Sequence, residues 1–232
     1  MKRYIIILIV LLSLASCTKH SEHWETLAQV ESYIEERPDS ALVVLQGIDN
    51  EELANDEERA KHALLLSMAL DKNFIDKTDF EVLQPAIDYY EDNGTATDKL
   101  RTYYYQGRIY QNAGNDALAM NCYINALESG GDSKDILTKA RLYVAQGLIY
   151  ASLLKWNDSN NAYQQAAECF YETNRIDSYV NCLLKIYNGY IQNGDYSDAE
   201  MILHKCDAYF DVMSNDKLGK YYAALFIIQI EK

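Results

Sequence analysis

Apolar residues recur along this chain with the spacing of amphipathic helices. They fall at i, i+3 or i+4 and i+7, as at Tyr103, Gly107 and Tyr110, which places them on one helix face. A short polar break follows, and after it comes a second set of small or aromatic residues, in one unit Ala119, Tyr123 and Ala126. The breaks at 112–115 and 193–195 contain Asn and Gly, which end helices. Each unit is therefore predicted to be a helix–turn–helix hairpin.

The hairpin pattern repeats every forty residues. Residues 99–110 and 139–150 share Lys, Arg, Tyr, Gln-Gly and Ile-Tyr at equivalent positions, and the same register extends to 59–70, 180–190 and 221–230. A period of this size indicates a stacked array of supersecondary units. We therefore expect residues 23–232 to form one array of about five hairpins, the last incomplete. The first hairpin, from Trp24 to about Ile48, keeps the phase poorly, as terminal repeats do.

Small residues are expected where the paired helices cross, with large residues filling the neighbouring layer. An irregular α-bundle is the alternative, but four registers in phase favour the repeat. The third unit departs from the pattern because Tyr187 replaces the glycine. The positions predicted to hold the repeat together are Gly107, Tyr110, Ala126, Gly147, Tyr150, Ala166 and Tyr190.

The order of residues from Gly107 through Tyr110, Gly114, Ala119 and Tyr123 to Ala126-Leu127 resembles the tetratricopeptide repeat. This resemblance implies an all-α fold of tetratricopeptide-like hairpins stacked as a right-handed α-solenoid. The chain departs from the family in having Gln106 and Gln146 in place of leucine, no closing proline and a longer period. Residues 37–42, 70–76 and 89–91 look like those of tetratricopeptide-type lipoproteins of Bacteroidetes.

The N-terminus has the pattern of an export signal. Met1-Lys-Arg3 is basic, residues 4–14 are apolar and too few to span a bilayer, and Leu14-Ala-Ser-Cys17 resembles the bacterial lipobox. We therefore expect residues 1–16 to be a lipoprotein signal peptide, Cys17 to carry acyl chains, and residues 17–22 to be a tether. An ordinary signal or an uncut anchor is the alternative. The protein would then be anchored in the cell envelope, at the outer membrane facing the periplasm, with surface exposure as the other possibility.

The negative net charge argues against nucleic acid and anionic lipid as partners. The chain has 21 basic and 35 acidic residues, and a formal net charge of −14 repels nucleic acid and anionic lipid. Four cysteines remain beside Cys17. Cys182 and Cys206 lie symmetrically about the turn at Gly194, but packed helix axes are ~8–10 Å apart, so we expect buried thiols rather than a disulfide. The alternative is that Cys122, Cys169, Cys182 and Cys206 pair in an oxidising periplasm.

Catalytic chemistry has little support in the residues. The four histidines form no His-Glu-x-x-His motif, and no paired-cysteine metal spacing is present. His20, Glu22 and His23 could approach a metal, but their place in the tether favours a solvated linker. We therefore predict a non-enzymatic protein with no cofactor and no metal ligand.

The concave groove of such an array is lined by the first helices, so residues offset from the core stripe are predicted to face it. Lys61, Arg101 and Arg141 form a row of cations forty residues apart. In tetratricopeptide proteins that clamp carboxy-terminal peptides, basic residues and Asn at such positions hold the carboxylate. The alternative is that these side chains pair with surplus Asp and Glu. The predicted partner-binding residues are Lys61, Arg101, Tyr104, Arg108, Arg141, Asn181 and Asn188; Leu64, Met68, Val144, Leu148 and Leu184 face the same way.

Together these observations predict a membrane-anchored adaptor or scaffold lipoprotein that binds a protein or peptide in its groove and contacts the membrane through its lipid. One alternative is a shortened sensor module of a repeat-containing regulator. Another is an accessory protein of glycan uptake, which would need exposed aromatic residues and carboxylates in one cleft.

Overall fold

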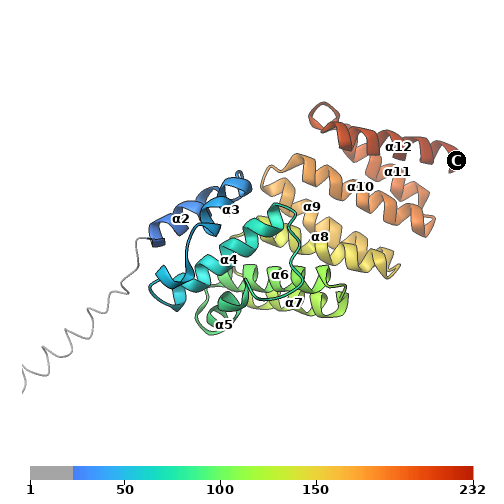
Figure 1. The fold of residues 1–232 in the computed structure, drawn as a ribbon. Coiled ribbons are helices and arrows are strands. Elements are labelled where there is room, and N and C mark those ends of the chain that lie inside the picture. Colours follow the sequence, from blue (N-terminus) through green and yellow to red (C-terminus); the bar gives the residue numbers. More distant parts are fainter. Residues whose placement is uncertain (1–22, 232) are drawn as a thin grey trace, which may run out of the picture. The chain divides into compact units, whose positions relative to one another are not determined.

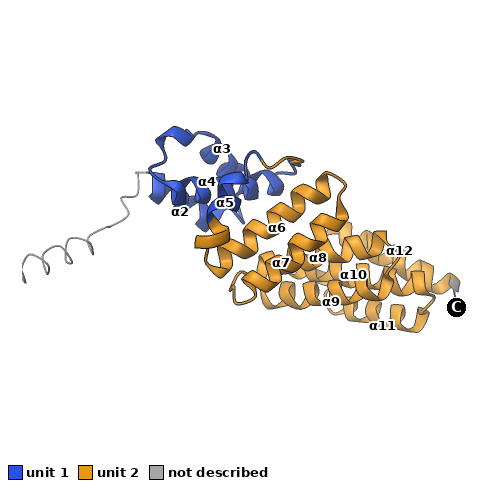
Figure 2. Ribbon diagram, turned by 90° about the horizontal axis from the view of Figure 1, so that it is seen from below, with its two compact units in different colours: residues 1–76, 81–89 blue, residues 77–80, 90–232 orange. Residues whose placement is uncertain are grey.

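The computed structural model describes residues 23–231 (Figure 1). The predicted signal segment 1–16, Cys17 and the tether up to residue 22 lie outside the described residues. The chain folds into two compact units, coloured separately in Figure 2: residues up to 76 with 81–89, and residues 77–80 with 90–232. The described chain contains helices and no strands, with helix pairs packed against each other, as the sequence predicted.

The first unit contains one complete hairpin and a second, irregular one. Its described elements are α2 (His23–Tyr33), α3 (Pro38–Gln46), the short 3-10 helix η1 (Asn50–Glu52), α4 (Asp56–Lys72) and the first part of α5 (Gln84–Asn93). Helix α4 packs against both α2 and α3. Its buried His62 is 2.8 Å from the carbonyl oxygen of Leu45, and burial lowers the pKa of this imidazole, so the neutral ring ties α4 to α3.

The second unit is a regular succession of hairpins. Its elements are α6 (Ala96–Asn112), α7 (Asp116–Gly130), α8 (Ile136–Ser152), α9 (Trp156–Glu172), α10 (Ile176–Asn193), α11 (Tyr196–Asp207), the 3-10 helix η2 (Phe210–Val212) and α12 (Asn215–Glu231). Helix α6 pairs with α7, α8 with α9 and α10 with α11, and α12 packs on α10 and α11. The core of its C-terminal part is built by buried residues of α9 to α12.

Helix starts confirm the forty-residue repeat. The first helices of successive hairpins, α4, α6, α8 and α10, begin at Asp56, Ala96, Ile136 and Ile176, forty residues apart in each step. The turns keep the same register. Positive φ angles occur at Phe74, Gly114, Leu154 and Gly194, where the chain leaves the first helix of each hairpin. Glycine takes this left-handed conformation without steric cost, whereas Phe74 and Leu154 adopt it as non-glycine residues.

Small residues sit at the helix crossings, as the predicted register requires. A Cβ atom built on Gly107 would overlap Cε1 of Tyr123, and one built on Gly147 would lie 3.0 Å from Cε1 of Tyr163. Both tyrosine rings are buried, at 0% and 2% exposure, so they cannot swing away. Ala126 and Ala166 are fully buried on the second helices. Tyr110, Tyr150 and Tyr190 are only half-buried, at the edges of the packed layer.

The four cysteines of the described chain are free thiols. Cys122, Cys182 and Cys206 are buried and Cys169 is half-buried. Burial raises the pKa of Cys122 to about 11 and the pKa values of Cys182 and Cys206 to about 12. Because the thiolate is the reactive form, these three residues behave as small core side chains.

We predict opposite effects from alanine at two helical glycines. Glycine inside a helix normally destabilises by roughly 0.5–1 kcal/mol relative to alanine. At Gly107 the added methyl meets the buried ring of Tyr123, so Gly107→Ala should lower the free energy of unfolding, and Gly107→Leu should lower it by about 1–3 kcal/mol. At Gly219 nothing lies within 4 Å of the built Cβ, so Gly219→Ala should raise it.

Urea unfolding followed by far-UV circular dichroism measures both effects, with Gly219→Ala as the matched control. A Gly107→Leu protein as stable as the wild type would show that the helix crossing has been placed in the wrong register.

Candidate partner-binding cleft

A cleft opens between α10 and α12, the first helices of the last two repeats. Its cavity volume is about 260 Å³. Two asparagines and two lysines provide its polar groups, and leucine, tyrosine, alanine and isoleucine side chains its apolar surface. The residues that line it are Asn181, Leu184, Lys185, Tyr187, Asn188, Lys220, Ala223, Ala224 and Ile227.

Helical periodicity explains how each wall is formed. On α10, Asn181, Leu184 and Asn188 follow one another at i, i+3 and i+7, so they share one face of the helix. On α12 the same spacing relates Lys220, Ala223 and Ile227. The two faces point into the same space because both helices occupy the first-helix position of their repeats.

Tyr187 is a buried residue of the cleft lining. It stands where the two preceding repeats have Gly147 and Gly107, forty and eighty residues earlier. Its side chain is 1% exposed, and its hydroxyl donates a 3.0 Å hydrogen bond to the carbonyl oxygen of Ala224. A large side chain at a crossing position thus links α10 to α12 by a directional contact instead of close backbone packing.

The polar groups of the cleft are available to a ligand. Within the described residues, Asn181, Lys185 and Asn188 form no hydrogen bond or ion pair, and Asn188 and Lys185 are exposed. Lys220 is 2.8 Å from an exposed carboxylate, that of Asp216 one helical turn away. An asparagine amide can both donate to and accept from a peptide backbone, and a lysine ammonium attracts a carboxylate. The chemistry of these groups therefore suits a peptide backbone and an anionic group.

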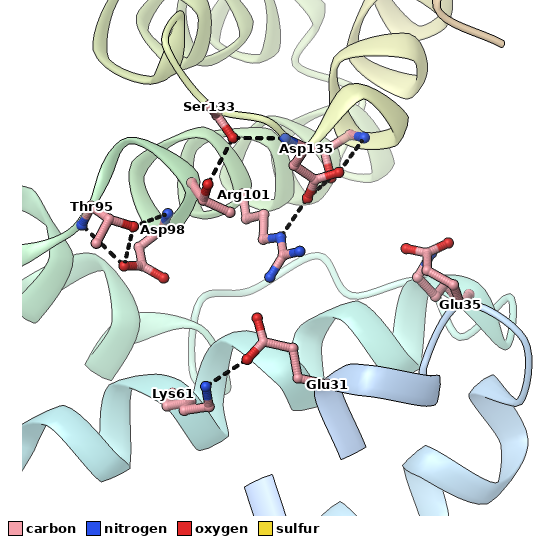
Figure 3. A network of polar contacts seen from close by, with 11 residues as sticks. Glu31, Glu35, Lys61, Thr95, Asp98, Arg101, Ser133 and Asp135 are labelled. Carbon is pink, nitrogen blue, oxygen red and sulfur yellow. Dashed lines mark hydrogen bonds and ion pairs between the residues drawn. The ribbon is translucent and has the colours of Figure 1, made fainter. Parts of the chain in front are cut away.

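Arg101 does not belong to this cleft but to a network that joins two hairpins (Figure 3). Its guanidinium donates from Nε to Asp135 across 2.5 Å, and both side chains are largely buried. Asp135 also caps α8, because it accepts hydrogen bonds from the backbone N–H and the hydroxyl of Thr138. Ser133 adds a 2.8 Å contact to Thr97 of α6 and accepts from the N–H of Asp135. The network fixes the start of α8 to α6.

Electrostatics in this network favour the ionised carboxylate. Burial by itself would raise the pKa of Asp135, but the charge and hydrogen bond of Arg101 and the hydrogen bonds of Thr138 outweigh it, so the pKa is lowered. Arg101 therefore forms an ion pair within the protein. This agrees with the alternative expectation, in which the cations pair with Asp and Glu.

Lys61 is engaged in the same way within the first unit. Its ammonium lies 2.5 Å from the Glu31 carboxylate (Figure 3). It also lies 5.1 Å from the centre of the Trp24 ring. Both contacts tie α4 to α2. Arg108 donates to Gln111 on its own helix at 2.9 Å, and Arg141 is half-buried on α8.

The expectation that Tyr104 offers an exposed flat contact is wrong. Its side chain is 4% exposed, and its ring lies against Tyr105 and Tyr123 at centroid distances of 4.9 and 6.0 Å. Leu64 and Met68 are likewise buried in the first unit. Tyr104 is covered because its ring faces Tyr123 on α7, the hairpin partner of α6.

Of the residues singled out in the sequence, the structure brings Asn181 and Asn188 together in the cleft, along with Leu184. Sequence reasoning missed Lys185, Lys220 and the apolar residues of α12. One signal in the sequence pointed to this region, namely Tyr187 at the position of the repeat glycine. A large residue there changes how the helices of the repeat pack.

Two further properties of residues 23–231 bear on function. They contain no group of three or more His, Cys, Asp or Glu side chains placed to hold a metal ion. In this same stretch we find no helix with the length and hydropathy needed to cross a membrane.

Comparisons with known proteins support the fold. No protein-family model matches the chain, and no curated protein matches it. Among solved structures, the apo form of RapI, a tetratricopeptide-like helical repeat protein, matches with a TM-score of 0.69 and 16% identity. The match covers 89% of this chain and 60% of the RapI chain, so this chain spans about 60% of the length of that neighbour. At this identity the likeness shows a helical-repeat fold.

We predict that the charge of Asp135 stabilises the second unit in a pH-dependent way. Its folded pKa lies below its unfolded value, ordinarily about 3.9, so its contribution is complete above that value and is lost as the pH falls through the folded pKa. Asp135→Asn leaves Arg101 without this carboxylate. The variant should lose about 2–3 kcal/mol at pH 7, less than for a fully buried pair because 12–17% of these side chains stays exposed.

The measurement is urea unfolding at several pH values from 7 to 3. The wild type should lose more stability over this range than Asp135→Asn. Asp158→Asn, which removes an exposed first-turn carboxylate of α9, is the matched control and should cost less than about 1 kcal/mol. Parallel pH profiles for the wild type and Asp135→Asn would contradict the assignment.

Proposed function

We propose that this chain is a non-catalytic scaffold that binds an extended segment of a protein or peptide partner in the cleft between α10 and α12. The observation that carries the proposal is the set of polar groups in the cleft that lack partners among the described residues, Asn181, Lys185 and Asn188, beside an apolar wall. A helical-repeat fold supports it, because stacked hairpins present such surfaces. Amide side chains suit a peptide backbone, and the lysines favour an acidic side chain or a terminal carboxylate.

The proposal also decides which cations are suitable for a charge-reversal test of binding. Reversing the charge of Arg101 would place a second carboxylate beside Asp135, and the resulting loss of binding could simply reflect unfolding. Lys185 and Lys220 are exposed residues of the cleft, so their charges can be reversed without burying a new charge. They provide the cleaner test.

We further propose that the scaffold is a lipoprotein of the cell envelope, anchored through Cys17 at the outer membrane and facing the periplasm. The lipobox-like Leu14-Ala-Ser-Cys17 after a short apolar segment supports this part of the proposal. Acyl chains on the cysteine give stable anchoring, since two or more chains hold a protein at a membrane. Surface exposure is the alternative orientation.

Photocrosslinking tests the cleft. A photoreactive amino acid replaces Asn188 in the full-length chain, and intact cells are irradiated. We expect one covalent adduct with a partner protein, and at least a tenfold weaker adduct when Lys185→Glu and Lys220→Glu are added. Lys205→Glu, an exposed charge reversal on α11 outside the cleft, is the matched control and should leave the adduct unchanged. Equal adduct in all three proteins would refute a role for the cleft.

Membrane fractionation tests the anchor. Cys17→Ser should abolish incorporation of a labelled fatty acid and shift the protein from the membrane to the soluble fraction, because the acylated sulfur is removed. Cys169→Ser, at the half-buried thiol, is the control and should retain both properties. Retention of label by Cys17→Ser would place the lipid on another residue, and absence of label in the wild type would exclude lipidation.

A further inference from the structure

Helix α12 has an apolar face that no described residue covers. Tyr222, Phe226 and Ile230 follow one another at i, i+4 and i+8 and are 55%, 64% and 65% exposed. We call these three residues the α12 stripe. In the preceding repeat, forty residues earlier, stand Cys182, Ile186 and Tyr190, of which the first two are buried at 1% and 2% exposure. Surface that is packed away in one repeat is thus open in the next.

The opposite face of α12 is already occupied. Tyr221, Ala224 and Ile228 are buried in the core shared with α10 and α11. The stripe therefore lies on the side of α12 that points away from its own unit, and it is separate from the cleft, whose α12 residues are Lys220, Ala223, Ala224 and Ile227.

Residues of η2 extend the apolar surface. The ring of Phe210 lies 6.0 Å from that of Tyr222, and Phe210 is 39% exposed. Val212, on the same short helix, is 63% exposed. Isolated exposed apolar residues need no explanation, but a contiguous group on a helix marks an interaction site.

We propose that the α12 stripe packs against the α12 stripe of a second copy of this chain, in an antiparallel two-fold pair. A two-fold contact brings the same surface of both copies together, so a face of one charge sign would repel itself. From residue 221 to residue 230, α12 carries no charged residue, and its stripe is therefore suited to this arrangement. Gly219 lies one turn before Tyr222 with nothing within 4 Å of a built Cβ, which leaves room for a side chain of the second copy.

The exposed area is adequate for a pair. A large apolar side chain buries about 150–250 Å² when fully covered, so the stripe with Phe210 and Val212 provides on the order of 500 Å² per copy. Two copies would bury about 1,000 Å², the lower limit for a specific interface. Because so much of this area belongs to three residues, the pair should depend strongly on Phe226 at the centre.

Two differently tagged full-length chains, co-expressed and extracted in detergent, test the proposal. The wild-type chains should co-purify, and Phe226→Glu should reduce co-purification at least tenfold, because it places two carboxylates at the centre of the contact. Met201→Glu changes a residue on α11 that is 52% exposed and should leave co-purification unchanged. Circular dichroism verifies that both variants keep the helical content of the wild type.

A cysteine crosslink distinguishes the occupants. In a Cys169→Ser background, which removes the half-buried thiol, a short bis-maleimide should convert Phe226→Cys to a species of twice the chain mass. The background chain and its Met201→Cys variant should give little, since the thiols of residues 122, 182 and 206 are buried. Crosslinking of Phe226→Cys to a protein of another mass would assign the stripe to a different helix and overturn the proposal. Absence of both the crosslink and co-purification would show that the stripe is unpaired, and would overturn it as well. Neither result bears on the cleft, whose residues are unchanged.

Discussion

The repeat depends on one steric constraint, the close crossing of the two helices in each hairpin. At Gly107 and Gly147 the backbone of a first helix lies against the face of a buried tyrosine, and any Cβ atom at these positions would enter the contact distance of the ring. The helices can pack this tightly only if the first helix presents a glycine and the second presents a flat ring at the same level. The forty-residue period keeps these two requirements in register, and the hairpins can then stack as similar units.

The cleft follows from relaxing this constraint in the third repeat of the second unit. Tyr187 cannot let two backbones approach, and its hydroxyl instead reaches the backbone of α12. The glycine of this region is found two residues later at Gly189, facing Asn160 of α9, so close packing is kept toward the preceding hairpin. A large residue at this crossing position therefore adds a directional contact from α10 to α12, while α10 stays paired with α11. The space that results is lined by residues of two first helices rather than by a hairpin.

The sequence predicted those features that depend on backbone period and residue size. Helix pairs, the forty-residue register and the turns at Gly114 and Gly194 all follow from steric rules that act along the chain. It predicted side-chain roles less well. The burial of Tyr104 involves the ring of Tyr123 on α7, and the pairing of Arg101 depends on Asp135 in the connection between hairpins. A helix-face argument counts one neighbouring helix, whereas a first helix of a stacked array contacts two.

In the part of the chain that the structure describes, the basic residues of this acidic protein have two different roles: some form internal ion pairs, and others remain on the surface without one. The chain has 35 acidic residues, and two cations on first helices, Arg101 and Lys61, are held by carboxylates within their own units. These pairs are largely removed from solvent, so they orient helices and leave little charge for a ligand. Lys185 lies on α10 without an ion pair among the described residues, next to two asparagines that also lack partners there. A cation kept out of internal pairing on such a surface retains its full attraction for an anionic ligand, and the surrounding negative charge limits which ligands approach. The selectivity of the cleft would therefore come from shape and backbone hydrogen bonds, with a single sign of local charge fixing the orientation of the bound segment.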